Sequence, residues 1–399
     1  MEWKLKDLTV DGKGSYGIGA PAVPYQEDKL TYLRITDIND DGSLNFSDLK
    51  SVDAEDAEKY ILKENDIVFA RTGNSTGRSY FYEKQHGTFV YAGFLIKFSL
   101  DPNKVNPRIL KYYTHSKPYF DWVNSFDTGA TRGNINAKTY GDMEIELPSR
   151  KVQDKIVSIL SSLDRKIELN NKINADLEEM AQAIFKNWFV DFEPFKDGKF
   201  VDSELGMIPE GWKVGRLGDI TKNKSAKVKE RNDVKVLSPV TTGELVLSEE
   251  YFTKQVFSSS IAKYKIVNKG DFAYNPARVN IGSLGRNEFD FDGCVSPVYV
   301  VFSVLDGYEN YFDLFRKTDF FKDSVASLAI GGVRQSLSYD DLSSIEVIIP
   351  SENAVEEFNN LYNQMKKTIK ANKLENSRLS LLRDTLLPRL MSGEIEVPE

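Results

Sequence analysis

The 399-residue sequence has little of what many enzymes, secreted proteins and membrane proteins require. Its one cysteine, Cys294, excludes an internal disulfide framework and fits a reducing cytoplasm. Two histidines, His86 and His115, leave no basis for a zinc site. The apolar runs are far shorter than the roughly 18 residues that cross a bilayer, and the start lacks the pattern of a signal peptide. The sequence therefore predicts a cytoplasmic protein without a metal site or a membrane span.

Catalytic motifs are missing as well. The sequence contains no P-loop, no nucleophile elbow and no HExxH, and no glycine-rich cofactor turn follows a predicted strand. Residues 275–278, NPAR, are partly like the Asn-Pro-Pro-aromatic loop of amino-group DNA methyltransferases, but they lack the aromatic residue that would stack on a flipped base. These absences favour a binding protein over a degenerate methyltransferase. Binding of S-adenosylmethionine by the isolated chain would favour the enzyme.

The charge is unevenly distributed. The net charge of −8 argues against general coating of nucleic acid. Acidic residues dominate 37–66, whereas 221–231, TKNKSAKVKER, holds five basic residues against one acidic residue. Because DNA binding requires a local basic surface and not a basic total, this run supplies Lys224 and Lys227 as candidate contacts. A solvated loop is the alternative interpretation of the run.

The chain contains an internal repeat. Residues 131–148 align without gaps on residues 333–350, at an offset of 202 that persists through the next forty residues. The segments 65–79 and 270–286 also resemble each other, but only with gaps. Two copies of one globular-plus-helix unit are therefore expected in the chain.

The forty residues after each copy have the heptad spacing of a long helix. Both helices place two asparagines in the same two layers of their apolar seams, and these are Asn170, Asn174, Asn372 and Asn376. A buried asparagine costs stability but fixes register, so we expect the helices to pack on each other. A parallel pair would need the linker to return about 60 Å, which favours antiparallel packing. Arg383, at the position of Ala181, departs from the seam, and two helices on separate cores remain the alternative.

The predicted fold class is α/β (α+β), a pseudo-symmetric repeat with two globular domains separated by a long antiparallel helical coiled coil. Strands are expected at 91–100 and 293–304, and short strands end at Pro148 and Pro350. Helices rich in aromatic residues, which we assign to the core, are expected at 110–126 and 310–328. The predicted boundaries are 1–148, helix 149–190, linker 191–211, 212–350, helix 351–392 and tail 393–399.

Loops rich in Arg, Asn, Ser, Thr and Gly occur at corresponding places in the two copies. Arginine can read guanine through two donors, and asparagine or glutamine can read adenine. For any single residue an ordinary turn is the simpler interpretation, but the duplicated set favours DNA binding. The candidates in these loops are Arg71, Thr72, Asn74, Ser75, Arg78, Thr131, Arg132, Asn134, Asn275, Arg278, Asn280, Arg286, Arg334, Gln335 and Ser336.

The chain resembles the specificity subunits of type I restriction–modification systems over its whole length. The segments that carry the resemblance are FARTGNSTGRS at 69–79, SELGMIPEGWKVGRLGDI at 203–220, YNPARVNIGS at 274–283 and LLPRLMSGEIEV at 386–397. The second and the last are quite specific to the family. The globular domains diverge widely within it, so the resemblance does not reveal the target sequence.

The resemblance implies a non-catalytic DNA-binding subunit. The domains at 1–148 and 212–350 would be target-recognition domains, each reading half of a split asymmetric site in double-stranded DNA. The helices would act as a ruler and dock two modification subunits, which methylate adenine with S-adenosylmethionine. Two restriction subunits, which use ATP and magnesium, can join. No cofactor is expected on this chain itself.

The repeat supports the same arrangement independently. Two like domains joined by antiparallel helices would be related by a pseudo-two-fold axis, which presents opposite DNA strands to equivalent surfaces. The competing interpretation is a coiled-coil adaptor that binds proteins only. A gel shift with genomic fragments would distinguish them, because an adaptor would bind all fragments alike.

Overall fold

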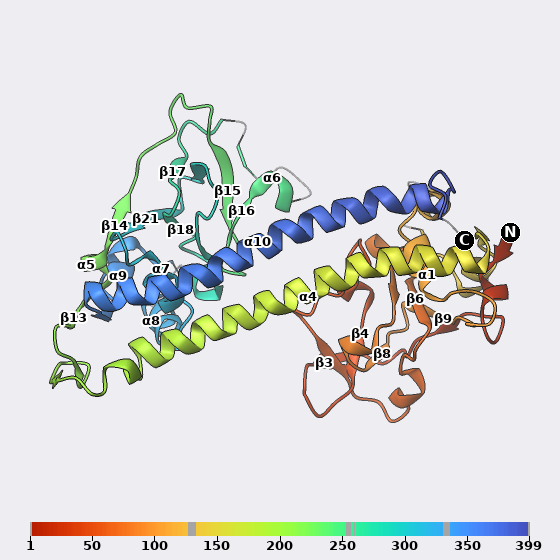
Figure 1. Cartoon of the computed structure of the whole chain (residues 1–399), viewed down its shortest axis with the longest axis horizontal. Coiled ribbons are helices and arrows are strands. Elements are labelled where there is room, and N and C mark those ends of the chain that lie inside the picture. The colour runs from red at the N-terminus through yellow and green to blue at the C-terminus, as the bar shows by residue number, and fades with distance from the viewer. Residues whose placement is uncertain (1, 127–132, 253–256, 259, 330–335, 398–399) are drawn as a thin grey trace. The chain divides into compact units, whose positions relative to one another are not determined.

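The computed structural model describes residues 2–126, 133–252, 257–258, 260–329 and 336–397. The chain forms two compact units: unit 1 is Met1–Asn170 with Lys373–Glu399, and unit 2 is Asn171–Asn372. Each unit therefore contains a globular domain and half of each long helix (Figure 1). The units divide both helices near their middle, whereas the sequence boundaries were drawn at the helix ends.

The two long helices are α4, Arg150–Phe189, and α10, Glu352–Met391, with 40 residues each. Each begins two residues after a proline, Pro148 or Pro350, that follows a short strand. Proline does not continue the strand because it has no backbone N–H for the ladder. Beyond their ends, Phe192 and Gly393 have positive φ values of 56° and 75°, which turn the chain away from the helix axis. The helices predicted at 149–190 and 351–392 are thus present.

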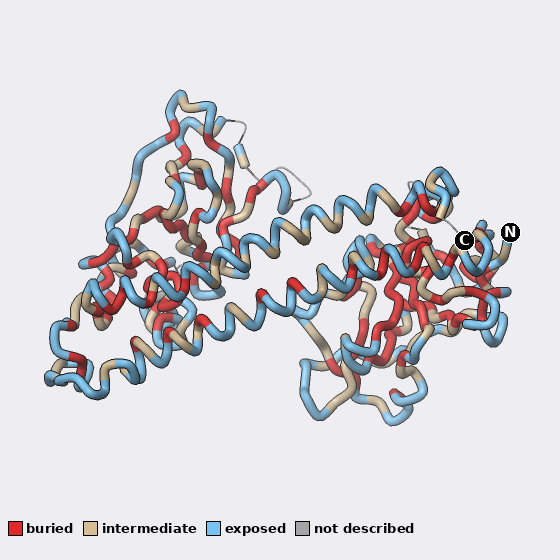
Figure 2. Tube along the Cα trace, viewed as in Figure 1, coloured by how far each residue is buried: buried red, intermediate tan, exposed pale blue. Residues whose placement is uncertain are grey.

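The two helices pair antiparallel in both units. In unit 1, Asp164 binds Arg383 at 3.0 Å and Asn170 binds Asn376 at 2.9 Å, so the numbering of α4 rises as that of α10 falls. In unit 2, Asn174 accepts a hydrogen bond from Asn372 at 2.9 Å, and the rings of Phe185 and Phe358 lie 6.2 Å apart. Figure 2 shows isolated buried positions along helices that are otherwise largely exposed. This is the burial pattern of a narrow two-helix seam.

Unit 1 has two four-stranded sheets and a two-stranded pair. The first sheet, in the order β2-β9-β6-β7, consists of Ser15–Tyr16, Leu95–Ser99, Asp66–Ala70 and Ser79–Phe81. The second, in the order β3-β5-β4-β8, consists of Ala22–Pro24, Lys50–Val52, Thr31–Leu33 and Phe89–Tyr91. Strands β1, Glu2–Lys4, and β10, Glu144–Glu146, form the pair, which brings the start of the domain next to the start of α4.

Unit 2 repeats this plan. Its first sheet, in the order β14-β21-β18-β19, consists of Thr221–Lys224, Val300–Val304, Phe272–Tyr274 and Leu284–Arg286. Its second, in the order β16-β15-β20-β17, consists of Leu245–Leu247, Lys235–Pro239, Gly293–Val295 and Lys265–Val267. Strand β13, Lys213–Arg216, pairs with β22, Glu346–Ile349, before α10. Each domain is therefore a mixed α+β fold, as the repeat in the sequence predicts.

Short helices and linker strands complete both units. In unit 1 they are η1 Leu5–Leu8, η2 Ile35–Asp37, η3 Ala57–Tyr60, η4 Gly73–Ser75, η5 Lys84–His86, α1 Arg108–Tyr113, α2 Lys117–Asn124 and α3 Ala137–Gly141. In unit 2 they are η6 Glu193–Phe195, β11 Phe200–Val201, β12 Ile208–Pro209, α5 Leu217–Ile220, α6 Ser248–Tyr251, η7 Val279–Ile281, α7 Glu309–Phe315, α8 Asp319–Ala329 and α9 Tyr339–Ser343.

Four predicted elements are each divided in two. The strand predicted at 91–100 begins in the last residue of β8 and resumes as β9, and that at 293–304 comprises β20 and β21. The helix predicted at 110–126 comprises part of α1 and α2, and that at 310–328 comprises α7 and most of α8. Apolar content identified these segments, but it does not locate the turns at Gly93 and Thr318. The assignment of their aromatic residues to the core is correct for Tyr119 and Phe312, which are fully buried.

The central hairpins have the same register in the two units. Ile67 faces Phe81 in β6–β7 and Phe272 faces Arg286 in β18–β19, a gapless correspondence at an offset of 205. The sequence comparison placed gaps within this segment, and the structure corrects that alignment. The side chains between the paired strands differ between the copies, so residue type alone could not find the register.

Candidate nucleic-acid interface

Two loops of equal length connect the equivalent hairpin strands. We call them loop 1, residues 71–78, and loop 2, residues 276–283. Each is closed by a backbone hydrogen bond: Ala70 donates to Arg78 at 2.8 Å, and Asn275 donates to Ser283 at 3.1 Å. Gly77 and Gly282 have φ values of 89° and 96°, where a side chain would be strained. The two units thus present loops of the same frame with different side chains.

Loop 1 begins with an arginine that is held in place from several sides. The guanidinium of Arg71 lies 5.0 Å from the centre of the Tyr16 ring, a cation–π contact. The amide of Arg71 donates to the carbonyl of Phe94 at 3.1 Å, and its carbonyl accepts from Ile135 at 2.9 Å. Its Nε is buried and has no hydrogen-bond partner among the described residues. This fixed cation is the strongest candidate in unit 1 for a contact with DNA.

The other candidates of loop 1 divide by exposure. Asn74 is exposed, Thr72 is half-buried and Ser75 is buried. Arg78 donates from Nε to Asp40 at 2.6 Å and from Nη1 to the carbonyl of Ile38 at 2.9 Å. These bonds leave Arg78 less available for a base than its sequence context suggests.

The repeat block beside loop 1 is only partly described. The hydroxyl of Thr76 donates to the carbonyl of Gly133 at 2.9 Å, which ties loop 1 to this block. Asn134 is exposed, and so is Ser336, which occupies the corresponding position in unit 2. The remaining candidates lie outside the described residues, and they are Thr131, Arg132, Arg334 and Gln335.

Loop 2 carries its exposed polar groups at different positions from loop 1. Arg278 and Asn280 are exposed, and the side chain of Arg278 has no hydrogen bond or ion pair among the described residues. Burial raises the pKa of Tyr299, and the nearby charge of Arg278 opposes that rise. The amide oxygen of Asn275 accepts from the backbone of Ala277 at 3.1 Å. Arg278 and Asn280 are therefore the accessible candidates of this loop.

Two further candidates of unit 2 have partners within the domain. Arg286 donates to Asn310 at 3.0 Å, and only 16% of its side chain is exposed. Lys224 binds both carboxylate oxygens of buried Asp271, at 2.8 and 3.0 Å. Lys227, in the same basic run, is exposed. The run at 221–231 is thus partly structural and partly a solvated surface.

The acidic segment of unit 1 is partly paired within its own domain. Arg34 binds Asp37 at 2.5 Å and Asp48 at 3.3 Å. Buried Asp66 binds Lys97 at 3.4 Å, and Asp40 binds Arg78. These ion pairs consume much of the segment's negative charge.

Sequence patterns missed several exposed groups near the loops. Phe94 and Val298 lie in the turns before β9 and β21 and are 60% and 72% exposed. Apolar side chains of this kind can contact a thymine methyl group or an unstacked base step. Tyr16, 43% exposed, was missed as well. No periodic pattern marks these positions, because each depends on a turn that only the fold defines.

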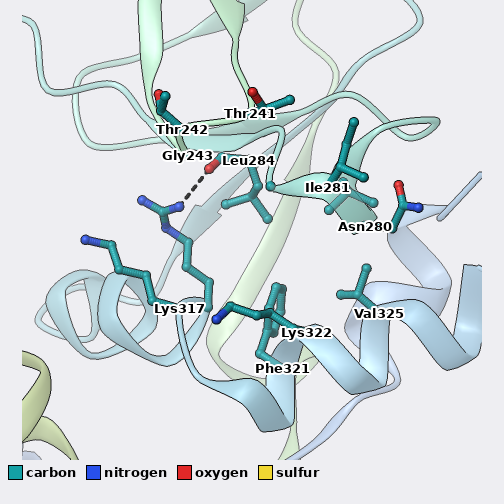
Figure 3. A pocket seen from close by; sticks show the side chains of 13 residues that line it. Thr241, Thr242, Gly243, Asn280, Ile281, Leu284, Lys317, Phe321, Lys322 and Val325 are labelled. Carbon is teal, nitrogen blue, oxygen red and sulfur yellow. Dashed lines mark hydrogen bonds between the residues drawn. The ribbon is translucent and has the colours of Figure 1, made fainter. Parts of the chain in front are cut away.

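A hollow of about 490 Å³ lies beside loop 2 (Figure 3). Thr241, Thr242 and Asn280 line it on one side, with the threonine side chains pointing away from α8, and Lys317 and Lys322 line it on the side of α8. Arg316 also lines the hollow, and it donates to the carbonyl of Leu284 at 2.7 Å. We call it the α8 hollow.

The four asparagines of the helix seam come together in two pairs, one in each unit. Asn170, with no exposed surface, donates to Asn376 at 2.9 Å and to Glu375 at 2.8 Å. Asn372 donates to Asn174 at 2.9 Å. Arg383, the departure from the seam, binds Asp164.

Among the described residues, no cluster of three or more His, Cys, Asp or Glu side chains could hold a metal ion. In the same part of the chain, none of the helices has the length and apolarity needed to span a membrane.

Comparisons with known proteins agree on one family. Residues 16–179 match the model of the type I restriction modification DNA specificity domain. The chain is 29% identical over 302 residues to the type I restriction enzyme MjaIX specificity subunit of Methanocaldococcus jannaschii, covering 73% of this chain and 69% of that protein. It is 25% identical over 422 residues to the HindI specificity subunit of Haemophilus influenzae, covering 84% and 88%.

A solved structure has the same fold. The S subunit of a type I restriction–modification system from M. genitalium superposes with a TM-score of 0.57 at 16% identity, covering 98% of this chain and 96% of that one.

Proposed function

We propose that this chain is a specificity subunit of the type I restriction–modification family, and that its two domains read different halves of a bipartite DNA site. Its relatives are specificity subunits, which confirms the expectation of a non-catalytic subunit that recognises a DNA sequence. The finer assignment, one half-site for each domain, rests on loops 1 and 2.

The observation that carries the proposal is a shared frame with different side chains. The hairpins have identical register, yet Arg71 corresponds to Pro276, Gly73 to Arg278 and Asn74 to Val279. Because base identity is read by donors and acceptors on side chains, equivalent loops with different side chains should prefer different bases. An asymmetric site with two unlike halves follows from such a pair.

We assign Arg71, Asn74 and Asn134 of unit 1, and Arg278, Asn280 and Lys227 of unit 2, to the DNA-facing surface. Arg71 and Arg278 offer paired N–H donors to guanine or phosphate, and the asparagines offer a donor and an acceptor to adenine. Arg78, Arg286 and Lys224 act within the domains, because their donors are already bonded to Asp40, Asn310 and Asp271.

The paired helices α4 and α10 are proposed as the ruler that sets the spacer and as the docking surface for two modification subunits. Those partners would supply S-adenosylmethionine-dependent adenine methylation, and two restriction subunits with ATP and magnesium could join them. This chain is expected to bind no cofactor itself. The hydrogen-bonded asparagine pairs support the ruler, since they fix one register of the helices.

The decisive experiment is methylome sequencing of the host with the natural chain and with residues 1–148 exchanged for the domain of a relative. We expect only one half of the methylated motif to change, and an exchange of 212–350 should change the other half. Changes in both halves, or in neither, would contradict modular reading. Flat binding of all genomic fragments by the assembled complex would instead support a protein-only adaptor.

The ruler has its own test. Inserting four residues, about one helical turn, into one long helix should lengthen the spacer and leave both half-sites unchanged. Methylated sites that keep their original spacing would show that the helices do not set it.

A further inference from the structure

The α8 hollow has the chemistry of an anion site. The polar residues that line it are Thr241, Thr242, Asn280, Arg316, Lys317 and Lys322. No carboxylate lines it. Two carboxylates lie next to lining residues, since Thr242 donates to Glu244 at 3.3 Å and Lys322 binds Asp319 at 3.2 Å.

The charges at the hollow do not all cancel. Arg316 is neutralised by buried Asp313, which accepts from its Nε at 2.9 Å and its Nη2 at 2.7 Å. Lys322 lies 3.2 Å from Asp319, but both side chains are largely exposed, so that pair is weak. The ammonium group of Lys317 has no hydrogen bond or ion pair among the described residues, but its charge also helps to lower the pKa of Asp313. The hollow therefore keeps positive charge available for a ligand.

The walls of the hollow are held in place. Arg316 bonds to Leu284 at the end of loop 2. The backbone at Gly282 approaches Thr241 so closely that a Cβ would lie 2.6 Å from the Thr241 carbonyl oxygen. Loop 2 and the turn at 241–243 thus form one fixed wall, and α8 forms the other (Figure 3).

The equivalent face of unit 1 lacks these cations. The offset of 202 that aligns the backbone bonds of α1–α2 with those of α7–α8 places His115 at Lys317 and Phe120 at Lys322. His115 is half-buried against Gly42, and Phe120 is 38% exposed. The cationic hollow is therefore a property of the second copy and not of the repeated fold.

We propose that the α8 hollow binds a phosphate group of the DNA backbone, and that it anchors unit 2 next to the bases that loop 2 reads. This inference rests on the proposed DNA-binding function. Asn280 belongs both to the hollow and to loop 2. A DNA strand whose bases contact loop 2 would therefore pass Lys317 and Lys322. A phosphate contact fixes register without reading sequence, which suits a site beside a reading loop.

The test replaces both lysines, Lys317→Gln with Lys322→Gln, in the chain assembled with its modification subunits. DNA affinity is measured by fluorescence anisotropy across a salt series. We expect affinity to fall about tenfold for specific and unrelated DNA alike, and the salt slope to fall by about one, as for one lost phosphate contact. The methylated motif should stay the same. Lys269→Gln, an exposed lysine elsewhere in unit 2, controls for the general loss of charge.

The remaining outcomes separate this inference from the function on which it rests. Unchanged affinity and slope, or a changed motif, would overturn the phosphate site while the natural complex still recognises its sequence. Absence of sequence-specific binding by the natural complex would refute the proposed function itself. The hollow is also large enough for a free nucleotide, so stabilisation of the natural chain by ATP, lost in the double variant, would overturn the assignment to DNA.

Discussion

In unit 1 the globular domain is joined to the long helices by buried charges, whereas in unit 2 the equivalent joint is made mainly of amides and aromatic rings. Buried Glu83 of unit 1 accepts from Arg108 at 2.9 Å and Lys111 at 3.0 Å. Lys111 also binds Asp164 of α4 at 3.1 Å, and Asp164 binds Arg383 of α10. One chain of ion pairs thus connects α1 to both helices.

The joint of unit 2 places different chemistry at the same positions. Asn310 donates to Asn359 and Asn363 of α10, both at 3.0 Å. The ring of Tyr311 lies 5.5 Å from that of Phe185 and 5.1 Å from that of Phe189. Lys366 binds Glu288 at 2.7 Å, a pair that is partly exposed.

The repeat offset shows that the charges are inverted between the two joints. Lys111 corresponds to Asp313, Asp164 to Lys366 and Arg383 to Ala181. A domain bearing Lys111, placed on the helix bearing Lys366, would bring two ammonium groups together at a joint with little exposure. Each domain is therefore matched to its own helix, and a domain exchange should carry the partner position along with the domain.

The largest effect is expected from removing an aromatic anchor of unit 2. Phe358→Ala should destabilise unit 2 by about 4 kcal/mol, because Phe358 is 1% exposed and packs on Phe185, Trp188 and Phe189. Hydrogen exchange, read separately for each unit, would measure the loss. Ile156→Ala, the equivalent change in unit 1, should act on unit 1 instead. If either variant lowered the hydrogen-exchange protection of both units equally, the two joints would not stabilise their units independently.

The next effect concerns the charged joint. Lys111→Met should destabilise unit 1 by about 3 kcal/mol, because it removes one cation from two buried carboxylates. Lys366→Met, which removes the cation from the joint of unit 2, should cost under about 1 kcal/mol, since Lys366 binds a carboxylate that is 55% exposed. Urea unfolding of the two variants provides the comparison. Equal costs would contradict the distinction between buried carboxylate partners in unit 1 and an exposed one in unit 2.

The carboxylates of the charged joint also predict acid sensitivity. Burial alone would raise the pKa of Glu83, but Lys111 and Arg108 outweigh it and lower the pKa to about 2, and the pKa of Asp164 is lowered by Lys111 and Arg383. Such groups stabilise the fold above their unfolded pKa of about 4, and that contribution is lost as pH falls from about 5 to about 2.

An acid titration followed by tryptophan fluorescence would test this, with Trp3 and Trp122 in unit 1 and Trp188 and Trp212 in unit 2. Lys111→Met should move the acid midpoint of unit 1 to higher pH, because the two pKa values rise when their cation is removed. Unit 2 should respond less, since Arg316, just after the end of α7, still holds the pKa of Asp313 at about 2 against its burial. An unchanged midpoint would show that the joint does not set acid stability.

Much of the fold could be predicted from the sequence because the repeat and the heptads are local patterns. The long helices, the short strands that precede Pro148 and Pro350, and the layers of Asn170 and Asn174 follow from periodicity and offset alone. The division of 91–100 into two strands could not be predicted in this way, because it depends on how a turn fits the second sheet.

The candidate site was predictable as loops and less so as residues. Sequence alone placed Arg78, Lys224 and Arg286 with Arg71 and Arg278 as equal candidates. Their partners are 38, 47 and 24 residues away, and only the fold brings those partners into contact. The α8 hollow was missed because its lysines lie on a helix whose aromatic residues define the core.

Effects smaller than that of Lys111→Met should come from the two asparagine pairs, one in each half of the helix seam. Asn170→Ala should cost about 2 kcal/mol, because it leaves Asn376 and Lys166 without a bond that they make in unit 1. Asn174→Ala should cost about 1 kcal/mol, since Asn174 accepts one hydrogen bond, from Asn372, in unit 2. The double variant Asn170→Leu with Asn376→Leu should restore stability while relaxing register, because paired apolar residues pack without a unique alignment. Urea unfolding measures the stability, and cysteine crosslinks placed one turn apart along α10 measure the register. A double variant as unstable as Asn170→Ala, with a single crosslinked register, would show that packing and not the amide pair aligns the helices.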